Sequence, residues 1–145
     1  MADSSIDDSH DLIQLISGVN RRLEQAIEAR LKPSGVAIEQ YRVLKALDVL
    51  DGQPMGELAA QVFVDSPTLT KIIDRMIANA DVYRAPDPHD RRRVLIFRSD
   101  KGAATYRNLQ ARVDGYEKTL VGQLERDGAG QLRVLLESLL RPTDI

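Results

Sequence analysis

The stretch from Asp65 to Gly102 constrains the fold of this chain more than any other, because its hydrophobic pattern changes period partway through. Apolar side chains over residues 66–80 recur at the spacing of an amphipathic helix. Beyond Asp81 apolar and polar residues alternate, as they do in a strand. A segment rich in Pro, Asp and Arg, residues 85–93, then leads to a second alternating run, residues 94–98. The pattern predicts a helix followed by a charged hairpin.

The residues before this helix indicate a helix-turn-helix. Residues 36–50 and 55–62 predict two further helices. The turn Val64-Asp65-Ser66-Pro67 supplies a capping side chain and a proline suited to a first helical turn. A short helix, a tight turn and an amphipathic helix form the arrangement that places a helix in a DNA groove. The side chains expected to be buried by the short helix are Leu58, Ala59 and Val62.

The polar face of the amphipathic helix offers possible DNA contacts. Hydroxyl groups near its start can reach phosphates or bases, Lys71 can neutralise a phosphate, and Arg75 can bind guanine or the backbone. Taken alone, the same residues are equally compatible with an ordinary solvated face. The residues on this face are Thr68, Thr70, Lys71, Asp74 and Arg75.

The predicted hairpin concentrates positive charge near its tip, at Arg91, Arg92 and Arg93. Arginine enters narrow minor grooves, where the negative potential is strongest. We expect Asp90 to orient one of these arginines rather than to touch DNA, and Arg98 to add a phosphate contact. Charge that merely protects a hairpin edge is the alternative, and the preceding helix-turn-helix pattern makes it the weaker interpretation.

Both ends of the chain predict helices with more apolar surface than one small domain can cover. Residues 4–31 form a long apolar-striped helix that must end near Pro33. Residues 100–126 form a second long helix, which Asp127–Gly130 separates from an apolar helix over residues 132–140. A homodimer built from both chain ends is the economical explanation.

Composition limits the remaining possibilities. The chain has 145 residues, no cysteine and two histidines far apart, so we expect one domain, no metal site and no cofactor. The net charge is −2, but residues 66–102 carry +3 and the remainder −5. No apolar run is long enough for a membrane span, and the acidic N-terminus lacks the order of a signal peptide. We therefore expect a cytoplasmic protein without membrane contact.

Five motifs follow one another between residues 36 and 102. They are Gln40-Tyr41-Arg42-Val43-Leu44, Gly56-Glu57-Leu58-Ala59, Asp65-Ser66-Pro67-Thr68-Leu69-Thr70-Lys71-Ile72-Ile73-Asp74-Arg75, Asp87-Pro88-His89-Asp90-Arg91-Arg92 and Lys101-Gly102. In this order and spacing they resemble the MarR family of bacterial transcription regulators. The resemblance implies a mainly α fold, a winged helix-turn-helix with a small β-wing. It also implies an N-terminal dimerisation helix (1–35), a DNA-binding region (36–102) and C-terminal dimerisation helices (103–145), all in one compact chain that forms a homodimer.

The resemblance also implies how DNA and a ligand are bound. The helix from Ser66 enters the major groove of a pseudo-palindromic operator, and the hairpin tip enters the minor groove. Such proteins commonly repress a nearby gene and release DNA when a small, often aromatic or phenolic, ligand binds between the dimerisation and DNA-binding regions. The DNA-binding residues that the resemblance implies are Ser66, Thr68, Thr70, Lys71, Arg75, Asp90 and Arg92. The charged hairpin tip adds Arg91 and Arg93 to the predicted set.

Candidate ligand-binding residues lie on helices expected to meet at that junction. An Arg or His there could pair with a carboxylate or phenolate, or could instead hold the dimer together. Asn20, on the apolar stripe of the first helix, could equally set the register between partner helices. The candidates are His10, Asn20, Tyr41, Arg42, Arg112 and Tyr116.

The chain departs from the family pattern at three places. Ala37 stands where the family often has a capping Thr, so the helix after it lacks a side-chain cap. Ala80-Asp81 replaces Gly-Leu, which removes easy access to positive φ and an apolar packing residue. Arg98-Ser99 replaces Leu-Thr. These changes bear on how the wing is oriented, and they remove no DNA-contacting side chain.

The sequence therefore predicts a dimeric, ligand-responsive DNA-binding regulator, usually a repressor. The alternative is a winged helix that docks another protein and binds no DNA, which the acidic overall charge favours slightly. We expect no enzymatic activity, because the spacing assembles no paired carboxylates, Gly-rich phosphate loop or nucleophile–base pair.

Overall fold

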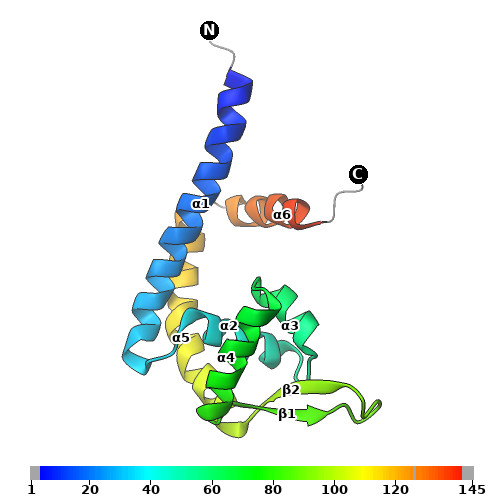
Figure 1. Cartoon of the computed structure of the whole chain (residues 1–145). Coiled ribbons are helices and arrows are strands. Elements are labelled where there is room, and N and C mark those ends of the chain that lie inside the picture. The colour runs from blue at the N-terminus through cyan, green and yellow to red at the C-terminus, as the bar shows by residue number, and fades with distance from the viewer. Residues whose placement is uncertain (1–3, 126, 142–145) are drawn as a thin grey trace.

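The computed structural model describes the backbone of residues 4–125 and 127–141, and the side chains among them from residue 11 onward. The fold is mainly α with one two-stranded antiparallel sheet, as predicted (Figure 1). Its elements in chain order are α1 (Ser4–Leu31), the 3-10 helix η1 (Lys32–Ser34), α2 (Ile38–Val49), α3 (Met55–Val62), α4 (Ser66–Ala78), β1 (Val82–Pro86), β2 (Val94–Arg98), α5 (Asp100–Gln123) and α6 (Gly128–Leu140).

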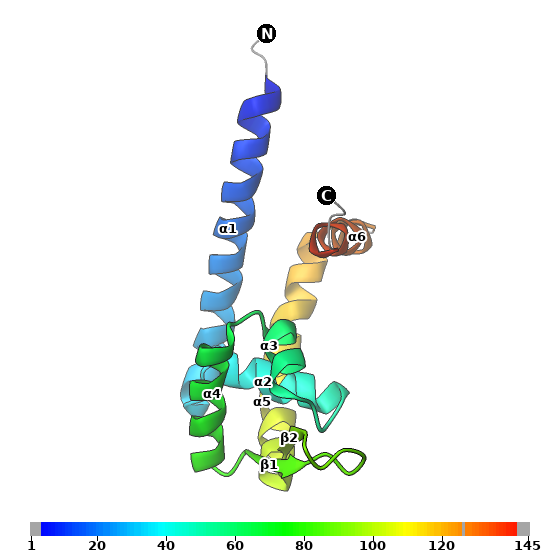
Figure 2. The same ribbon diagram turned by 45° about the vertical axis from the view of Figure 1, so that its right-hand side comes forward.

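The molecule has a compact end and an extended end (Figures 1 and 2). The compact end holds α2, α3, α4 and the sheet, and α1 and α5 run side by side away from it. The N-terminal half of α1 continues beyond its neighbours, and α6 projects from the far end of α5 (Figure 2). The predicted DNA-binding elements and the predicted dimerisation elements therefore lie at opposite ends.

The core is centred on α2 and the inner face of α4. Val43, Leu44 and Leu47 of α2 are fully buried, as are Leu69 and Ile73 of α4. Burial of each such side chain stabilises the fold by roughly 1.5–3 kcal/mol. The side chains predicted to be buried on α3 are also in the core, which confirms the helix-turn-helix pattern.

The two helices that frame this core begin differently. At α4 the Asp65 carboxylate accepts a hydrogen bond from the Thr68 backbone N–H at 2.8 Å. Hydrogen bonding to the Thr68 side chain, together with this backbone bond, lowers the pKa of Asp65 below its ordinary value. At α2 the N-cap residue is Ala37, which has no side-chain acceptor. Gln40 compensates in part, because its Oε1 accepts from the Ala37 N–H at 3.3 Å. The expected weakness at this cap is thus real but partly offset.

The wing is the antiparallel pair of β1 and β2, in a register that places Val82 opposite Arg98 and Pro86 opposite Val94. The sequence assigned Ala85 and Pro86 to the loop, and this was wrong. A proline is tolerated at the end of an outer strand because its missing N–H need not face the partner. On the other side of β2, Gln53 forms an isolated bridge with Ile96, so β2 is paired on both edges.

The boundary between the last two helices also differs from the prediction. The helix predicted to reach residue 126 ends at Gln123, where Leu124 adopts an extended conformation. The predicted break was Asp127–Gly130, but Asp127 is the N-cap of α6 and Gly128–Gly130 form its first turn. The two glycines each cost only about 0.5–1 kcal/mol of helix stability relative to alanine, which does not prevent a helix from starting there.

Two kinds of feature are missing from the described part of the chain. No helix within it combines the length and hydrophobicity needed to span a bilayer. No group of three or more His, Cys, Asp or Glu side chains within it is placed to hold a metal ion.

Candidate nucleic-acid interface and effector cavity

The outer face of α4 presents the side chains that the sequence placed there. The apolar residues Leu69, Ile73 and Met76 point into the core and thereby fix the rotation of the helix. Five polar side chains then face solvent, beginning at the N-terminal end of the helix, where the helix dipole favours anions. They are Ser66, Thr68, Thr70, Lys71 and Arg75.

One acidic residue on this face is neutralised from the wing. Asp74 lies 2.8 Å from the guanidinium of Arg84, a residue of β1. The pair joins the outer face of α4 to the first wing strand and offsets the negative charge between Lys71 and Arg75. The face therefore keeps a net positive charge where phosphate would lie.

The wing tip is a turn organised by aspartates. Asp87 accepts a hydrogen bond from the His89 N–H at 2.8 Å, and Asp90 accepts one from the Arg92 N–H at 3.2 Å. The Arg92 side chain is 97% exposed, and its Nε lies 4.0 Å from Asp90 Oδ1. Asp90 thus holds the backbone under Arg92, as expected of a residue that orients an arginine. Arg91 is likewise exposed.

Arg93 differs from Arg92 because its ion pair is closer and reaches another element of the fold. Its guanidinium lies 3.2 Å from Glu57 on α3. The contact holds the wing against the helix-turn-helix. Arg93, like Arg84, must therefore exchange a carboxylate for any phosphate that it meets.

The joint between α4 and β1 contains the altered Ala80-Asp81 pair. Ala80 has φ +62°, in the left-handed region that favours glycine, so the chain makes the turn without the family's Gly. Asp81 is buried although it replaces an apolar residue, and its carboxylate lies 3.7 Å from the Lys101 ammonium. Its backbone oxygen accepts from both the N–H and the hydroxyl of Ser99, at 2.9 and 3.0 Å.

Ser99 also begins α5, so one side chain ties the wing to the long helix. Its hydroxyl accepts from the Gly102 N–H at 2.9 Å, which caps α5. Gly102 lies directly over this joint. A Cβ there would stand 2.1 Å from the backbone oxygen of Asp81, a distance that no real contact tolerates.

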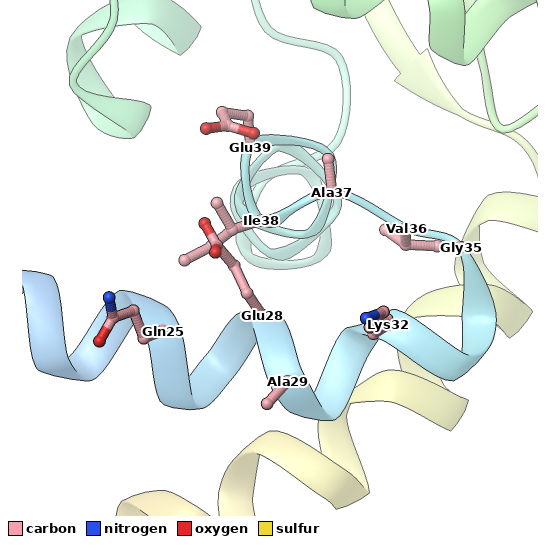
Figure 3. A pocket seen from close by; sticks show the side chains of 9 residues that line it. All are labelled: Gln25, Glu28, Ala29, Lys32, Gly35, Val36, Ala37, Ile38 and Glu39. Carbon is pink, nitrogen blue, oxygen red and sulfur yellow. The ribbon is translucent and has the colours of Figure 1, made fainter.

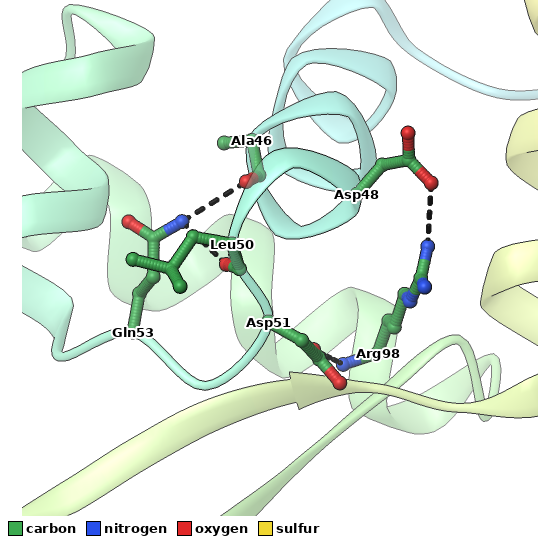
Figure 4. A network of polar contacts seen from close by, with 6 residues as sticks. All are labelled: Ala46, Asp48, Leu50, Asp51, Gln53 and Arg98. Atoms are coloured by element: carbon green, nitrogen blue, oxygen red, sulfur yellow. Dashed lines mark hydrogen bonds and ion pairs between the residues drawn. The ribbon is translucent and has the colours of Figure 1, made fainter.

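Arg98 does not point toward a DNA-facing surface, and the prediction of a phosphate contact was wrong. Its guanidinium binds Asp48 of α2 at 2.6 Å, and its backbone N–H donates to Asp51 at 2.9 Å (Figure 4). The side chain is about two-thirds buried. Arg98 therefore anchors the root of the wing to the end of α2.

Two of the predicted ligand residues share a cavity of about 630 Å³ among α1, α2 and α3, here called the Arg42 cavity. Arg42 and Lys45 supply positive charge from α2, and Glu24 of α1 lies 3.2 Å from the Arg42 guanidinium. Val49 and Phe63 supply apolar wall. The full lining is Asn20, Glu24, Arg42, Lys45, Ala46, Val49, Gln61 and Phe63.

The other predicted ligand residues lie elsewhere. Tyr41 is buried on a different face of α2, with its ring 5.7 Å from that of Tyr106, and burial raises the pKa of Tyr41 well above its ordinary value. Tyr116 lies between α1 and α5 with Arg30 4.4 Å over its ring, and Arg112 is exposed. The side chain of His10 falls outside those that the structure describes.

Sequence reasoning missed six residues of the Arg42 cavity, which are Glu24, Lys45, Ala46, Val49, Gln61 and Phe63. Lys45 and Val49 follow Arg42 at helical spacing, a signal that could have found them. Phe63 had no such signal. It ends α3 with φ +58° and is 74% exposed, so its ring stands in solvent beside the cavity instead of in the core.

A second cavity, of about 560 Å³, lies where α1 meets the start of α2 (Figure 3). It is lined by two carboxylates, Glu28 and Glu39, against one ammonium, Lys32. Its charge therefore suits an organic anion less well than that of the Arg42 cavity, where Arg42 and Lys45 outnumber Glu24.

With this geometry established, the comparisons with known proteins identify the fold family. The model of the MarR family matches residues 36–94. The regulator TtmR of Methylorubrum extorquens is 36% identical over 105 residues, which cover 72% of this chain but only 51% of TtmR. The chain thus spans about half of that relative.

Solved structures extend the likeness over nearly the whole chain. A mutant MarR of Escherichia coli complexed with operator DNA has a TM-score of 0.82 and 27% identity, covering 94% of this chain and 99% of that one. CouR of Rhodococcus jostii bound to p-coumaroyl-CoA has a TM-score of 0.85 and 28% identity, covering 94% and 96%. Residues 36–94 therefore form a MarR-family domain, and the chain as a whole has the fold of MarR-family structures.

Proposed function

We propose that this chain is a homodimeric transcriptional repressor that binds a pseudo-palindromic operator and releases it when a small aromatic anion binds. The observation that carries the proposal is the joint exposure of the outer face of α4 and of the Arg91–Arg92 tip. Both belong to the compact end of the molecule, away from α6 and the free half of α1 (Figures 1 and 2).

The DNA-binding mode follows from the chemistry of these two elements. Hydroxyls, Lys71 and Arg75 on a protruding helix suit the major groove, where arginine binds guanine through two hydrogen bonds. An exposed arginine such as Arg92, which Asp90 contacts at the backbone N–H and loosely at Nε, suits the minor groove. The operator-bound MarR structure of the same fold supports this assignment.

The dimer is supported by apolar surface at the other end of the molecule. Residues 131–140 of α6 and residue 141 after it are all exposed, although six of them are Leu or Val. The exposed part of α1 carries a second apolar group. A monomer rarely leaves such a contiguous patch in water. The large exposed apolar side chains are Leu12, Ile13, Leu15, Ile16 and Val19 on α1, Val121 on α5, and Leu132, Val134, Leu135, Leu136, Leu139 and Leu140 on α6.

The effector is assigned to the Arg42 cavity. A carboxylate would pair with Lys45, or with Arg42 in exchange for Glu24, while an aromatic ring would lie against Val49 and Phe63. The CouR structure contains p-coumaroyl-CoA, a derivative of an aromatic acid, which supports this ligand class.

Operator binding is tested with Arg75→Ala and Arg92→Ala. Each is expected to raise the Kd for a duplex selected in vitro by about tenfold, because each removes a guanidinium from a groove or a phosphate. Gel retardation at several salt concentrations measures both the Kd and its salt dependence. Arg21→Ala on α1 is the matched control, since Arg21 is exposed on the predicted dimerisation helix. Equal affinities of all four proteins would contradict the DNA-contact assignment.

Effector binding is tested with benzoate, 4-hydroxybenzoate and p-coumarate by isothermal titration. Lys45→Ala is expected to weaken binding about tenfold, because it removes a charge-assisted contact. Lys32→Ala, in the cavity of Figure 3, is expected to leave binding unchanged. The absence of heat with all three acids would exclude this ligand class. Weaker binding by Lys32→Ala than by Lys45→Ala would assign the ligand to the cavity of Figure 3 instead.

A further inference from the structure

Gln53 is a buried polar residue that the proposed DNA and ligand contacts do not use. Only 1% of it is exposed, and it lies in the connection between α2 and α3. Its Nε2 donates to the backbone oxygens of Ala46 and Leu50, at 3.0 and 2.7 Å (Figure 4). Its Oε1 accepts from Gln61 Nε2 at 2.6 Å. A glutamine with its side-chain groups fully engaged in the interior is held in one orientation.

The backbone of Gln53 extends this network into the wing. Its N–H donates to the Ile96 oxygen at 3.0 Å, and its own oxygen accepts from the Ile96 N–H at 2.8 Å. Ile96 is fully buried in β2, two residues before the Arg98 anchor. Gln53 therefore joins α2, α3 and the wing through one residue.

Two of the residues that form hydrogen bonds with the Gln53 side chain also line the Arg42 cavity. Ala46 lies on its α2 side and Gln61 on its α3 side. Gln61 is exposed, so its amide can turn toward a molecule in the cavity. Gln53 has no such freedom, because two carbonyl groups hold its amide nitrogen. The movable member of the network is thus the one on the cavity wall.

We propose that Gln53 is a positioning residue that links the wall of the Arg42 cavity to the wing. Through Gln53, the Gln61 amide in that wall determines how firmly β2 is paired at the root of the wing. While Gln61 donates to Gln53, the buried Oε1 is satisfied and the Gln53–Ile96 bridge is held. When the Gln61 amide turns away, that oxygen is left buried without a donor, which is unfavourable. Gln53 then leaves its position, and the bridge to Ile96 weakens.

The regulatory meaning of this link rests on the proposed function. A ligand that takes the Gln61 amide would loosen the wing while leaving α4 in place. Operator affinity would fall because the wing and α4 must fit their grooves together. The structural link between Gln61 and Ile96 holds independently of whether the chain binds an operator.

The test is native-state amide hydrogen exchange, followed by NMR on the full chain without DNA or ligand. Gln61→Leu removes the donor at an exposed position, so the protein keeps its core. We expect exchange at the backbone amides of Gln53 and Ile96 to become about fivefold faster than in the parent, as loss of one hydrogen bond predicts. Gln61→Lys keeps a donor and is expected to restore the parent rates. Gln25→Leu makes the same chemical change on α1 and is expected to alter neither amide.

The amide of Leu109, in α5, separates a local effect from general loss of stability. The proposal is supported if exchange in Gln61→Leu accelerates more at Gln53 and Ile96 than at Leu109. The acceleration must also be absent in Gln61→Lys, which supplies a donor. Unchanged exchange at Ile96, equal acceleration at all three amides, or failure of Gln61→Lys to rescue would each overturn it. Since no DNA is present, failure of operator binding in the retardation assay would leave this result unaffected and would count against the proposed function alone.

Discussion

Replacing Leu135 and Leu139 together by Asp is expected to convert the protein from a dimer to a monomer and to weaken operator binding about a hundredfold or more. Both leucines are among the most exposed apolar side chains of α6. In the proposed dimer they pack against the partner, and buried carboxylates without partners prevent that packing. A monomer binds only one half-site of the operator. It therefore lacks the high effective concentration at which the second subunit of a dimer meets the second half-site. Analytical ultracentrifugation measures the first effect and gel retardation the second.

A matched variant separates loss of packing from added charge. Gln131→Asp with Ser138→Asp adds the same two negative charges to α6, at positions that are polar in the parent. It is expected to remain dimeric and to bind the operator within about twofold of the parent, since surface substitutions away from an interface have small effects. If the leucine variant stays dimeric, α6 is not the dimerisation surface.

Gly102→Ala is expected to destabilise the fold by about 3 kcal/mol, and the Tm is expected to fall by about 10 °C. The added Cβ would stand 2.1 Å from the backbone oxygen of Asp81. Neither partner can move freely, because that oxygen accepts two hydrogen bonds from Ser99 and the Gly102 N–H donates to the Ser99 hydroxyl. The start of α5 and the root of the wing must therefore separate.

The control is Gly115→Ala in the same helix. A Cβ at Gly115 meets nothing within 4 Å. In the interior of a helix alanine is preferred over glycine by about 0.5–1 kcal/mol, so this variant is expected to be slightly more stable than the parent. Thermal unfolding followed by circular dichroism measures both changes. Similar Tm values for the two variants would show that the joint is looser than the Gly102–Asp81 distance indicates.

The helix-turn-helix was predictable because local signals and the tertiary fold agree there. The residues expected to be buried on α3 are in the core, and the apolar positions Leu69, Ile73 and Met76 of α4 all point inward. The cap at Asp65 fixed the start of α4 as well. Rotation and start together determine which side chains face outward, and so the exposed set on α4 followed from sequence.

The wing root was less predictable, because its conformation depends on partners distant in sequence. Nothing local indicates that Ala80 adopts positive φ, since the cost is offset by Ser99, which binds the backbone oxygens of Ala80 and Asp81. Arg98 was misplaced for the same reason. An arginine at the end of a strand resembles a phosphate contact until Asp48, fifty residues earlier, is known to lie beside it.

The candidate ligand-binding residues were the least predictable part of the site. Tyr41 and Arg42 are adjacent in sequence but face different sides of α2, one toward Tyr106 and the other toward Glu24. Which of them lines a cavity depends on how α1, α2 and α3 cross, and a single sequence contains no signal for a crossing angle. Only the pairing of Arg42 with Asn20 in one cavity matched the expected junction.

The ion pairs of Arg84 with Asp74 and of Arg93 with Glu57 imply an exchange of partners when DNA arrives. Each arginine is already neutralised, so meeting a phosphate releases a carboxylate into water as well as a counterion from DNA. Part of the electrostatic free energy of DNA binding is thereby cancelled. This loss affects weak complexes with DNA of arbitrary sequence as well as the complex with the specific site. In the proposed complex with DNA, the two carboxylates would therefore compete with the phosphate backbone for Arg84 and Arg93.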